Sequence, residues 1–126
     1  MNLTVYGIPV PKARPRMTKT GHCYTPKATA AYEFLVQQVW HWNGRHRLEG
    51  PIRMEVIFYF SRPKSAQNRV SHTVRPDLDN CIKSVMDGLN TLAFADDSQI
   101  VELVASKKYT TAKPRAEIIL EPVREF

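Results

Sequence analysis

The stretch IRMEVIFYF at 52–60 constrains the fold more than any other part of the chain. Its alternate residues are all apolar, and Ile57 and Tyr59 on the other face are apolar as well. A strand with one solvated face would alternate with polar residues, whereas a strand inside a sheet is apolar on both faces. The sequence therefore predicts a central strand whose main apolar face carries Ile52, Met54, Val56, Phe58 and Phe60.

Two segments have apolar residues at helical spacing. The first is predicted to begin with Thr25 as N-cap and Pro26 as first helical residue, and to end near Trp42, where Asn43-Gly44 follows. The second is predicted over 77–91. The buried stripes are predicted to consist of Tyr32, Leu35, Val36, Val39 and Trp40 in the first helix, and Leu78, Ile82, Val85, Met86 and Leu89 in the second.

Three further strands complete the predicted elements. One covers roughly 2–8, and two more alternate over 99–110 and 115–123, with Lys113-Pro114 at the bend of a hairpin between them. The stretches 9–26 and 61–75 have no periodicity and are predicted to be loops. The order βαβαββ predicts an α+β fold, in which two main helices pack on a small mixed β-sheet.

Length and composition favour a single folded domain over 1–126. The chain has 126 residues, which suits one hydrophobic core, and no repeat or linker divides it. An apolar fraction of 43% and a charged fraction of 24% argue against disorder. Cys23 and Cys81 are far apart and are expected to be free thiols in a reducing compartment.

The charge balance is unusual, with a formal net charge of +6. This excess favours phosphate backbones or anionic membranes as partners. No apolar run approaches the ~18–20 residues that span a bilayer, and residues 1–16 lack the order of a signal peptide. We therefore expect a cytoplasmic protein without a membrane partner. No phosphate-binding glycine loop is present, so no nucleotide cofactor is expected.

Carboxylates gather near a lysine between 75 and 102, in an otherwise basic chain. Asp77 and Asp79 open the second predicted helix, Lys83 follows one turn later, and Asp96-Asp97 lie in the turn after the helix. Two carboxylates two residues apart can share a hard cation such as Mg²⁺, and the 96–97 turn can add a third. Lys83 would supply positive charge to a transition state or orient the attacking water. This pattern indicates metal-dependent cleavage of a nucleic acid.

Each of these residues also has an interpretation without catalysis. Asp77 and Asp79 are suited to capping a helix, and Asp79 with Lys83 is suited to a surface ion pair. Asp96-Asp97 are ordinary turn residues, and Asp87 fits the solvated face of the helix. Spacing alone leaves both interpretations open.

Basic residues concentrate in three segments. PKARPR at 11–16 is stiffened by proline, and a second set lies in the loop that leads to Asp77. A third set lies around the last predicted hairpin and consists of Lys107, Lys108, Lys113 and Arg115. A basic segment is either a solvated surface or a phosphate-binding one. The candidate DNA-binding residues are Lys12, Arg14, Arg16, Lys19, Arg69 and Arg75.

The acidic motif resembles the RusA family of Holliday junction resolvases. The family pattern is D-L-D-N-x-x-K-x-x-x-D-x-L-N, followed after some ten residues by D-D-x-Q-I/V-V. The sequence GIPVPKARPR at 7–16 also resembles the opening of many phage-type members. The resemblance extends over essentially the whole chain. The motif is carried here by Asp77, Leu78, Asp79, Asn80, Lys83, Asp87, Leu89, Asn90, Asp96, Asp97, Gln99, Ile100 and Val101.

The resemblance implies a homodimer that binds four-way junction DNA and cuts two strands of like polarity symmetrically, with Mg²⁺ or Mn²⁺. It implies that Asp77, Asp79 and Asp97 are catalytic, metal-binding carboxylates and that Lys83 is the critical lysine. Such enzymes occur in bacteria and their prophages. Two other functions stay open: a non-catalytic protein that binds branched DNA through its basic loops, and a metal-dependent nuclease that acts on another nucleic acid.

Overall fold

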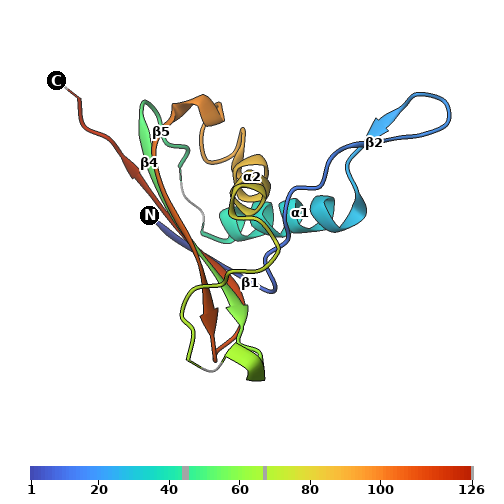
Figure 1. Cartoon of the computed structure of the whole chain (residues 1–126). Helices are drawn as coiled ribbons and strands as arrows, with labels where there is room; N and C mark the ends of the chain where they lie inside the picture. Colours follow the sequence, from blue (N-terminus) through green and yellow to red (C-terminus); the bar gives the residue numbers. More distant parts are fainter. Residues whose placement is uncertain (44–45, 67, 126) are drawn as a thin grey trace.

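The computed structural model describes residues 1–43, 46–66 and 68–125. A four-stranded mixed sheet in the order β1-β6-β4-β5 forms one layer, and both α-helices lie on one of its faces (Figure 1). The predicted α+β architecture, with two helices on a small mixed sheet, is therefore confirmed. The strands of this sheet are β1 (Asn2–Tyr6), β4 (Ile52–Ser61), β5 (Ile100–Thr110) and β6 (Arg115–Pro122).

The predicted central strand is confirmed in β4. It pairs with β5 in parallel on one side and with β6 in antiparallel on the other. Its even-numbered residues, from Ile52 to Phe60, are buried against the helices, and its odd-numbered residues on the open face are half-buried. Two strand neighbours satisfy its backbone groups on both sides, and the apolar face contributes to the core of the protein.

The expected hairpin between the last two strands is wrong. Residues 111–114 do join β5 to β6, but β4 lies between the two strands in the sheet. β6 fills the gap between β1 and β4, where Ala116 and Ile118 are buried. β5 is consequently an edge strand, and sequence proximity across a short connection did not decide the pairing.

The helices α1 (Lys27–Asn43) and α2 (Leu78–Leu89) pack against each other on the sheet. The stripe predicted for α1 is buried except for Leu35, which is half-buried. In α2 the buried set is shifted to Cys81, Ser84, Val85, Gly88 and Leu89. The small residues of α2 permit this rotation, because a Cβ added at Gly88 would lie 2.9 Å from the Cβ of Val36 on α1. Leu78, Ile82 and Met86 are half-buried beside the core.

The predicted loop at 9–26 contains a small hairpin that the periodicity did not reveal. Its strands are β2 (Arg16–Met17) and β3 (Cys23–Tyr24), and they form a separate two-stranded sheet. Figure 1 shows this hairpin projecting away from the two-layer body. Strands of only two residues are too short for an alternating pattern, so this stretch showed only the signals of a loop.

Several element ends differ by one or two residues from their predicted positions. β1 ends at Tyr6, because Gly7 with φ of 118° turns the chain. α1 begins at Lys27 rather than Pro26, and α2 ends at Leu89 rather than at 91. The predicted helix end near Asn43 is confirmed, whereas Gly44 lies outside the described residues. The loop at 61–75 contains the 3-10 turn η1 (Lys64–Ala66).

Cys23 and Cys81 are both free thiols, as expected. Burial raises the pKa of the Cys81 thiol to about 11, so it stays protonated at neutral pH. Among the described residues, no helix combines the length and apolarity needed to cross a membrane.

Candidate active site

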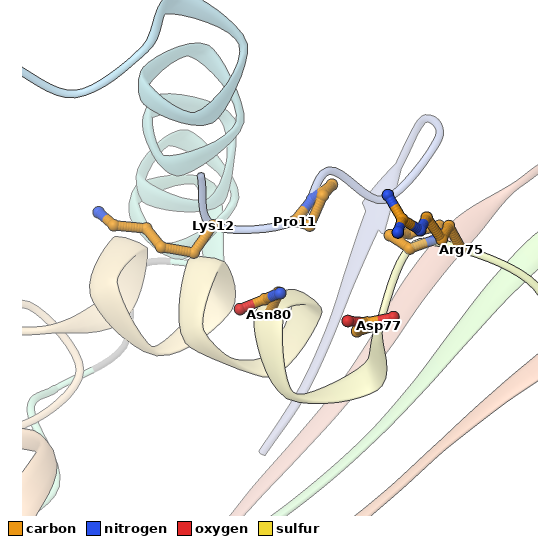
Figure 2. Close-up of a pocket in the computed structure, with 6 residues that line it drawn as sticks. Pro11, Lys12, Arg75, Asp77 and Asn80 are labelled. Carbon is orange, nitrogen blue, oxygen red and sulfur yellow. The ribbon is translucent and has the colours of Figure 1, made fainter. Parts of the chain in front are cut away.

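The first turn of α2 opens onto a cleft of about 480 Å³. Asp77 and Asn80 line it from the helix, Arg75 and Pro76 from the preceding loop, and Pro11 and Lys12 from the N-terminal segment. Figure 2 shows that the N-terminal segment crosses above α2, with Asp77 and Arg75 at the same end of the cleft.

The N-terminal segment is held by both helices. The Lys12 N–H donates to Asn80 O at 2.8 Å, and Ser84 Oγ donates to Val10 O at 2.6 Å. From α1, the buried Thr29 Oγ1 donates to Pro11 O and accepts from the Ala13 N–H, each at 3.1 Å. This wall of the cleft is therefore fixed by hydrogen bonds rather than by apolar contacts alone.

The two carboxylates of the first turn are exposed, and Asp77 does not act as a side-chain cap. Asp77 occupies the N-cap position with φ of −70° and ψ of 142°, but its side chain makes no capping hydrogen bond. Asp79 Oδ1 accepts only a local bond from the Asn80 N–H, at 2.9 Å. The capping interpretation of Asp77 therefore fails, and its carboxylate faces the cleft with unused acceptor capacity.

An alternating chain of charges runs across the adjacent surface. Lys83 Nζ lies 3.0 Å from Asp87 Oδ1 and 3.9 Å from Asp97 Oδ2. Asp87 Oδ2 in turn lies 3.0 Å from Lys12 Nζ, which also lies 2.6 Å from Glu33 Oε1. Asp87 thereby connects the proposed catalytic lysine to a cation that joins α1 and α2.

This network shifts two pKa values. Burial alone would raise the pKa of the Asp87 carboxyl, but hydrogen bonds from Lys12 and Lys83 outweigh it and leave that pKa below its ordinary value. Burial likewise opposes the charge of Lys12, but Glu33 and Asp87 raise its pKa above 10.5. Both groups are thus held in their charged forms.

Two interpretations from the sequence change as a result. Asp87 is not simply on a solvated face, because it accepts from two lysines. The ammonium of Lys12, a predicted DNA contact, is already paired with two carboxylates and points away from Asp77 (Figure 2). Glu33 was missed, since no local pattern relates a glutamate on one helix to a lysine 21 residues earlier.

The two acidic residues of the 96–97 turn are in different surroundings. The Asp96 N–H donates to Gln99 Oε1, and Asp96 Oδ2 accepts from Ser98 Oγ at 2.7 Å. Asp96 is therefore engaged in its own turn. Asp97, the first residue of the 3-10 turn η2 (Asp97–Gln99), is the one whose carboxylate approaches Lys83.

A metal ion would find carboxylate oxygens but no ready-made cage here. Within 1–43, 46–66 and 68–125 no group of at least three His, Cys, Asp or Glu side chains is arranged to hold a metal. Mg²⁺ commonly takes only one or two protein carboxylates and completes its shell with water and substrate phosphates. Asp77 and Asp79 fit that limited requirement in the chemistry of their donors.

The remaining candidate DNA-binding residues are exposed and occupy three places. Arg14, Arg16 and Lys19 lie in or beside the projecting β2–β3 hairpin, and Arg69 lies in the loop before α2. Arg75 lines the cleft next to Asp77. Positive charge therefore both borders the acidic residues and extends away from them along the hairpin.

The chain matches a family model and is similar to known proteins. The family model described as "Endodeoxyribonuclease RusA" matches residues 7–121. The chain is 35% identical over 138 residues to the uncharacterized protein YqaN of Bacillus subtilis (strain 168), covering 98% of this chain and 96% of that protein. It is 38% identical over 74 residues to the crossover junction endodeoxyribonuclease rusA of Lactococcus phage r1t, covering 58% of this chain and 56% of the phage protein.

Proposed function

Because the chain belongs to the RusA endodeoxyribonuclease family, we propose that it is a metal-dependent nuclease that resolves four-way DNA junctions. It cuts two strands of like polarity at symmetric positions. The observation that carries the proposal is the uncapped, exposed Asp77 beside Asp79, at a cleft bordered by basic side chains. The missing capping bond of Asp77 supports a role for its carboxylate in binding a ligand.

The acidic residues supply the binding site for the metal. Asp77 and Asp79 would hold Mg²⁺, or Mn²⁺ in its place, and Asp97 would approach from η2. When bound, such an ion supplies Lewis-acid stabilisation to a phosphodiester. Its shell requires only part of its ligands from the protein, so substrate phosphate is expected to complete the site.

Lys83 provides fixed positive charge beside Asp97, the third of these carboxylates. It is exposed enough to meet a phosphate, and Asp87 at 3.0 Å limits the directions its ammonium takes. A cation oriented before the reaction stabilises the charge that develops on the phosphate without a further cost of reorganisation. Asp87 is thus a positioning residue for Lys83.

DNA is proposed to be held by Arg14, Arg16 and Lys19 on the hairpin side and by Arg69 and Arg75 beside the cleft. Lys12 is left out of this set because Glu33 and Asp87 already neutralise it. Phosphate contacts of this kind orient a duplex without reading its sequence.

The proposal includes a homodimer that acts in the cytoplasm. A four-way junction has two-fold related strands, and paired cuts require two related active sites. A closed dimer supplies two identical sites with the matching symmetry.

The test compares a synthetic mobile four-way junction with a matched linear duplex, in Mg²⁺ or in EDTA. The variant Asp79→Asn is run beside Glu121→Gln, a change of the same charge at an exposed residue of β6 outside the site. We expect paired symmetric nicks in the junction only, abolished by EDTA and by Asp79→Asn but not by Glu121→Gln. Junction binding should survive in Asp79→Asn, because the variant repels phosphate less.

Two outcomes would overturn the proposal. Tight junction binding without cleavage in any divalent metal would indicate a non-catalytic protein that binds branched DNA. Equal cleavage of single-stranded DNA or RNA would indicate a nuclease with a different substrate.

A further inference from the structure

The segment before Asp77 is attached to the edge strand β5. The Tyr109 N–H donates to Val70 O at 2.8 Å, and the His72 N–H donates to Lys107 O at 3.1 Å. Between them, Ser71 and Lys108 form an antiparallel bridge. Residues 70–72 therefore continue the sheet for a few residues beyond β5, although the sequence there has no strand pattern.

An aromatic contact fixes the same segment from the side. The His72 ring stacks on Phe60 with centroids 4.0 Å apart and meets Tyr109 edge-on at 5.0 Å. His72 is buried, so the segment is anchored by packing as well as by backbone pairing.

Lys107 then holds the last residues of the segment. Its Nζ donates to Val74 O at 2.7 Å and to Pro76 O at 2.6 Å. These two carbonyls belong to the turn that ends at Asp77. Charge-assisted hydrogen bonds to two carbonyls fix the direction in which that turn enters α2. Lys107 thus contacts the turn directly before Asp77, while Asp77 itself lines the cleft.

We propose that Lys107 is a positioning residue for the active site. Its ammonium ties the turn at 74–76 to β5 and so holds the carboxylate of Asp77 in a fixed position relative to that of Asp79. The inference rests on the proposed function for its catalytic consequence. Its structural part, an ordered turn at 74–76, is independent of that function. Lys107 does not touch the substrate.

The test uses Lys107→Met, which keeps most of the apolar stem of the side chain and removes the donors. Lys107→Arg serves as the conservative variant, and Lys108→Met serves as the matched control, because adjacent residues of a strand point to opposite faces. Two readouts are compared: amide hydrogen exchange at 74–79 against the interior of α2, and the Mg²⁺ concentration for half-maximal junction cleavage.

We expect Lys107→Met to accelerate exchange at 74–79 selectively and to raise the required Mg²⁺ about tenfold, as loss of a group that orients metal ligands does. Junction affinity in EDTA should be unchanged in Lys107→Met. Lys107→Arg should keep both the exchange rates and the required Mg²⁺ concentration close to those of the wild type, and Lys108→Met should match the wild type. If Lys107→Met does not fold, Lys107→Gln takes its place with the same readouts.

The outcomes separate the two proposals. If the wild-type protein cleaves junctions and Lys107→Met has the same hydrogen exchange and the same Mg²⁺ dependence, the positioning role of Lys107 is overturned and the proposed function is not. A wild type that never cleaves would overturn the proposed function, while selective exchange at 74–79 would still support the structural part. A uniform increase in exchange over the whole chain would overturn the positioning role, because it indicates a general loss of stability.

Discussion

Replacing Lys12 by methionine separates a structural lysine from a DNA-binding one. The side chains of Lys12, Glu33 and Asp87 are only 21%, 17% and 21% exposed. Lys12→Met keeps most of the apolar stem but leaves two largely buried carboxylates without their shared cation. Breaking a fully buried pair costs about 3–5 kcal/mol, and breaking a surface pair costs about 0.2–1 kcal/mol.

These limits bracket the expected effect. Asp87 retains Lys83 as a partner, so its charge is not stranded completely. We therefore expect Lys12→Met to lower the free energy of unfolding by about 2 kcal/mol, the value for a hydrogen bond to a charged group. For a chain of 126 residues this corresponds to a fall in Tm of roughly 7 °C. Urea and thermal unfolding at pH 7 measure both quantities.

The pH dependence of this difference has a definite sign. The pKa of Asp87 is lowered in the folded protein, so its contribution is present above the unfolded value of 3.8 and is lost as pH falls through the folded pKa. The pKa of Lys12 is raised, so its contribution is present below 10.5 and is lost as pH rises through the folded pKa. The difference between wild type and Lys12→Met should therefore be flat near neutrality and shrink at both extremes.

Two controls make the reasoning refutable. Arg14→Met changes an exposed residue, so stability should stay within about 0.5 kcal/mol of wild type. The slope of log DNA affinity against log salt concentration should become shallower by about one unit, because one phosphate contact is lost. Lys12→Met should leave that slope unchanged, and adding Glu33→Gln should recover part of the lost stability. A Lys12→Met variant of wild-type stability with a reduced salt slope would refute the structural assignment and restore Lys12 as a phosphate contact.

Three further predictions concern the core, the anchored loop and the lysine network. Phe94→Ala, at a side chain with 0% exposure, should cost about 3–5 kcal/mol in denaturant unfolding, while Phe34→Ala, at 61% exposure, should change stability little. Burial, reinforced by the charge of Lys107, lowers the pKa of His72, so the folded protein binds its proton less readily than the unfolded chain and stability should fall as pH drops below 6.5. This loss of stability at low pH should be absent in His72→Phe, which is tested by measuring Tm of both proteins from pH 5 to 8. If the variant shows the same dependence of Tm on pH as the wild type, His72 is not the cause. Asp87→Asn should slow single-turnover cleavage by roughly 10–100-fold at unchanged junction affinity, by analogy with groups that orient metal ligands, and an unchanged rate would show that Lys83 needs no such support.

The candidate site was predictable from sequence only in part. Asp77 is the N-cap of α2, and Asp79 and Lys83 lie in its first two turns, so their placement at one end of the helix follows from the sequence. The approach of Asp97 to Lys83 depends on the η2 turn that follows α2. The metal role of the carboxylates stays a prediction, because their donor chemistry fits but no preformed group of three is found among the described residues.

Local periodicity alone determined β4 and the existence and approximate length of both helices. A strand that is apolar on both faces, or a stripe repeating every three to four residues, has few compatible structures. It determined the buried face of α2 less well, because the small residues Cys81, Ser84 and Gly88 carry little hydrophobic signal yet allow α1 to approach closely.

Only the tertiary structure decided which strands pair and which charges meet. β5 lies beside β4 rather than β6, Lys12 joins Glu33 to Asp87, and Lys107 reaches the carbonyls before Asp77. Each of these contacts joins residues that are far apart in the chain. These contacts form only when the whole core is buried. The free energy that selects one strand pairing over another comes from the combined packing of the sheet and the helices, and the local sequence of the two paired segments does not contain it.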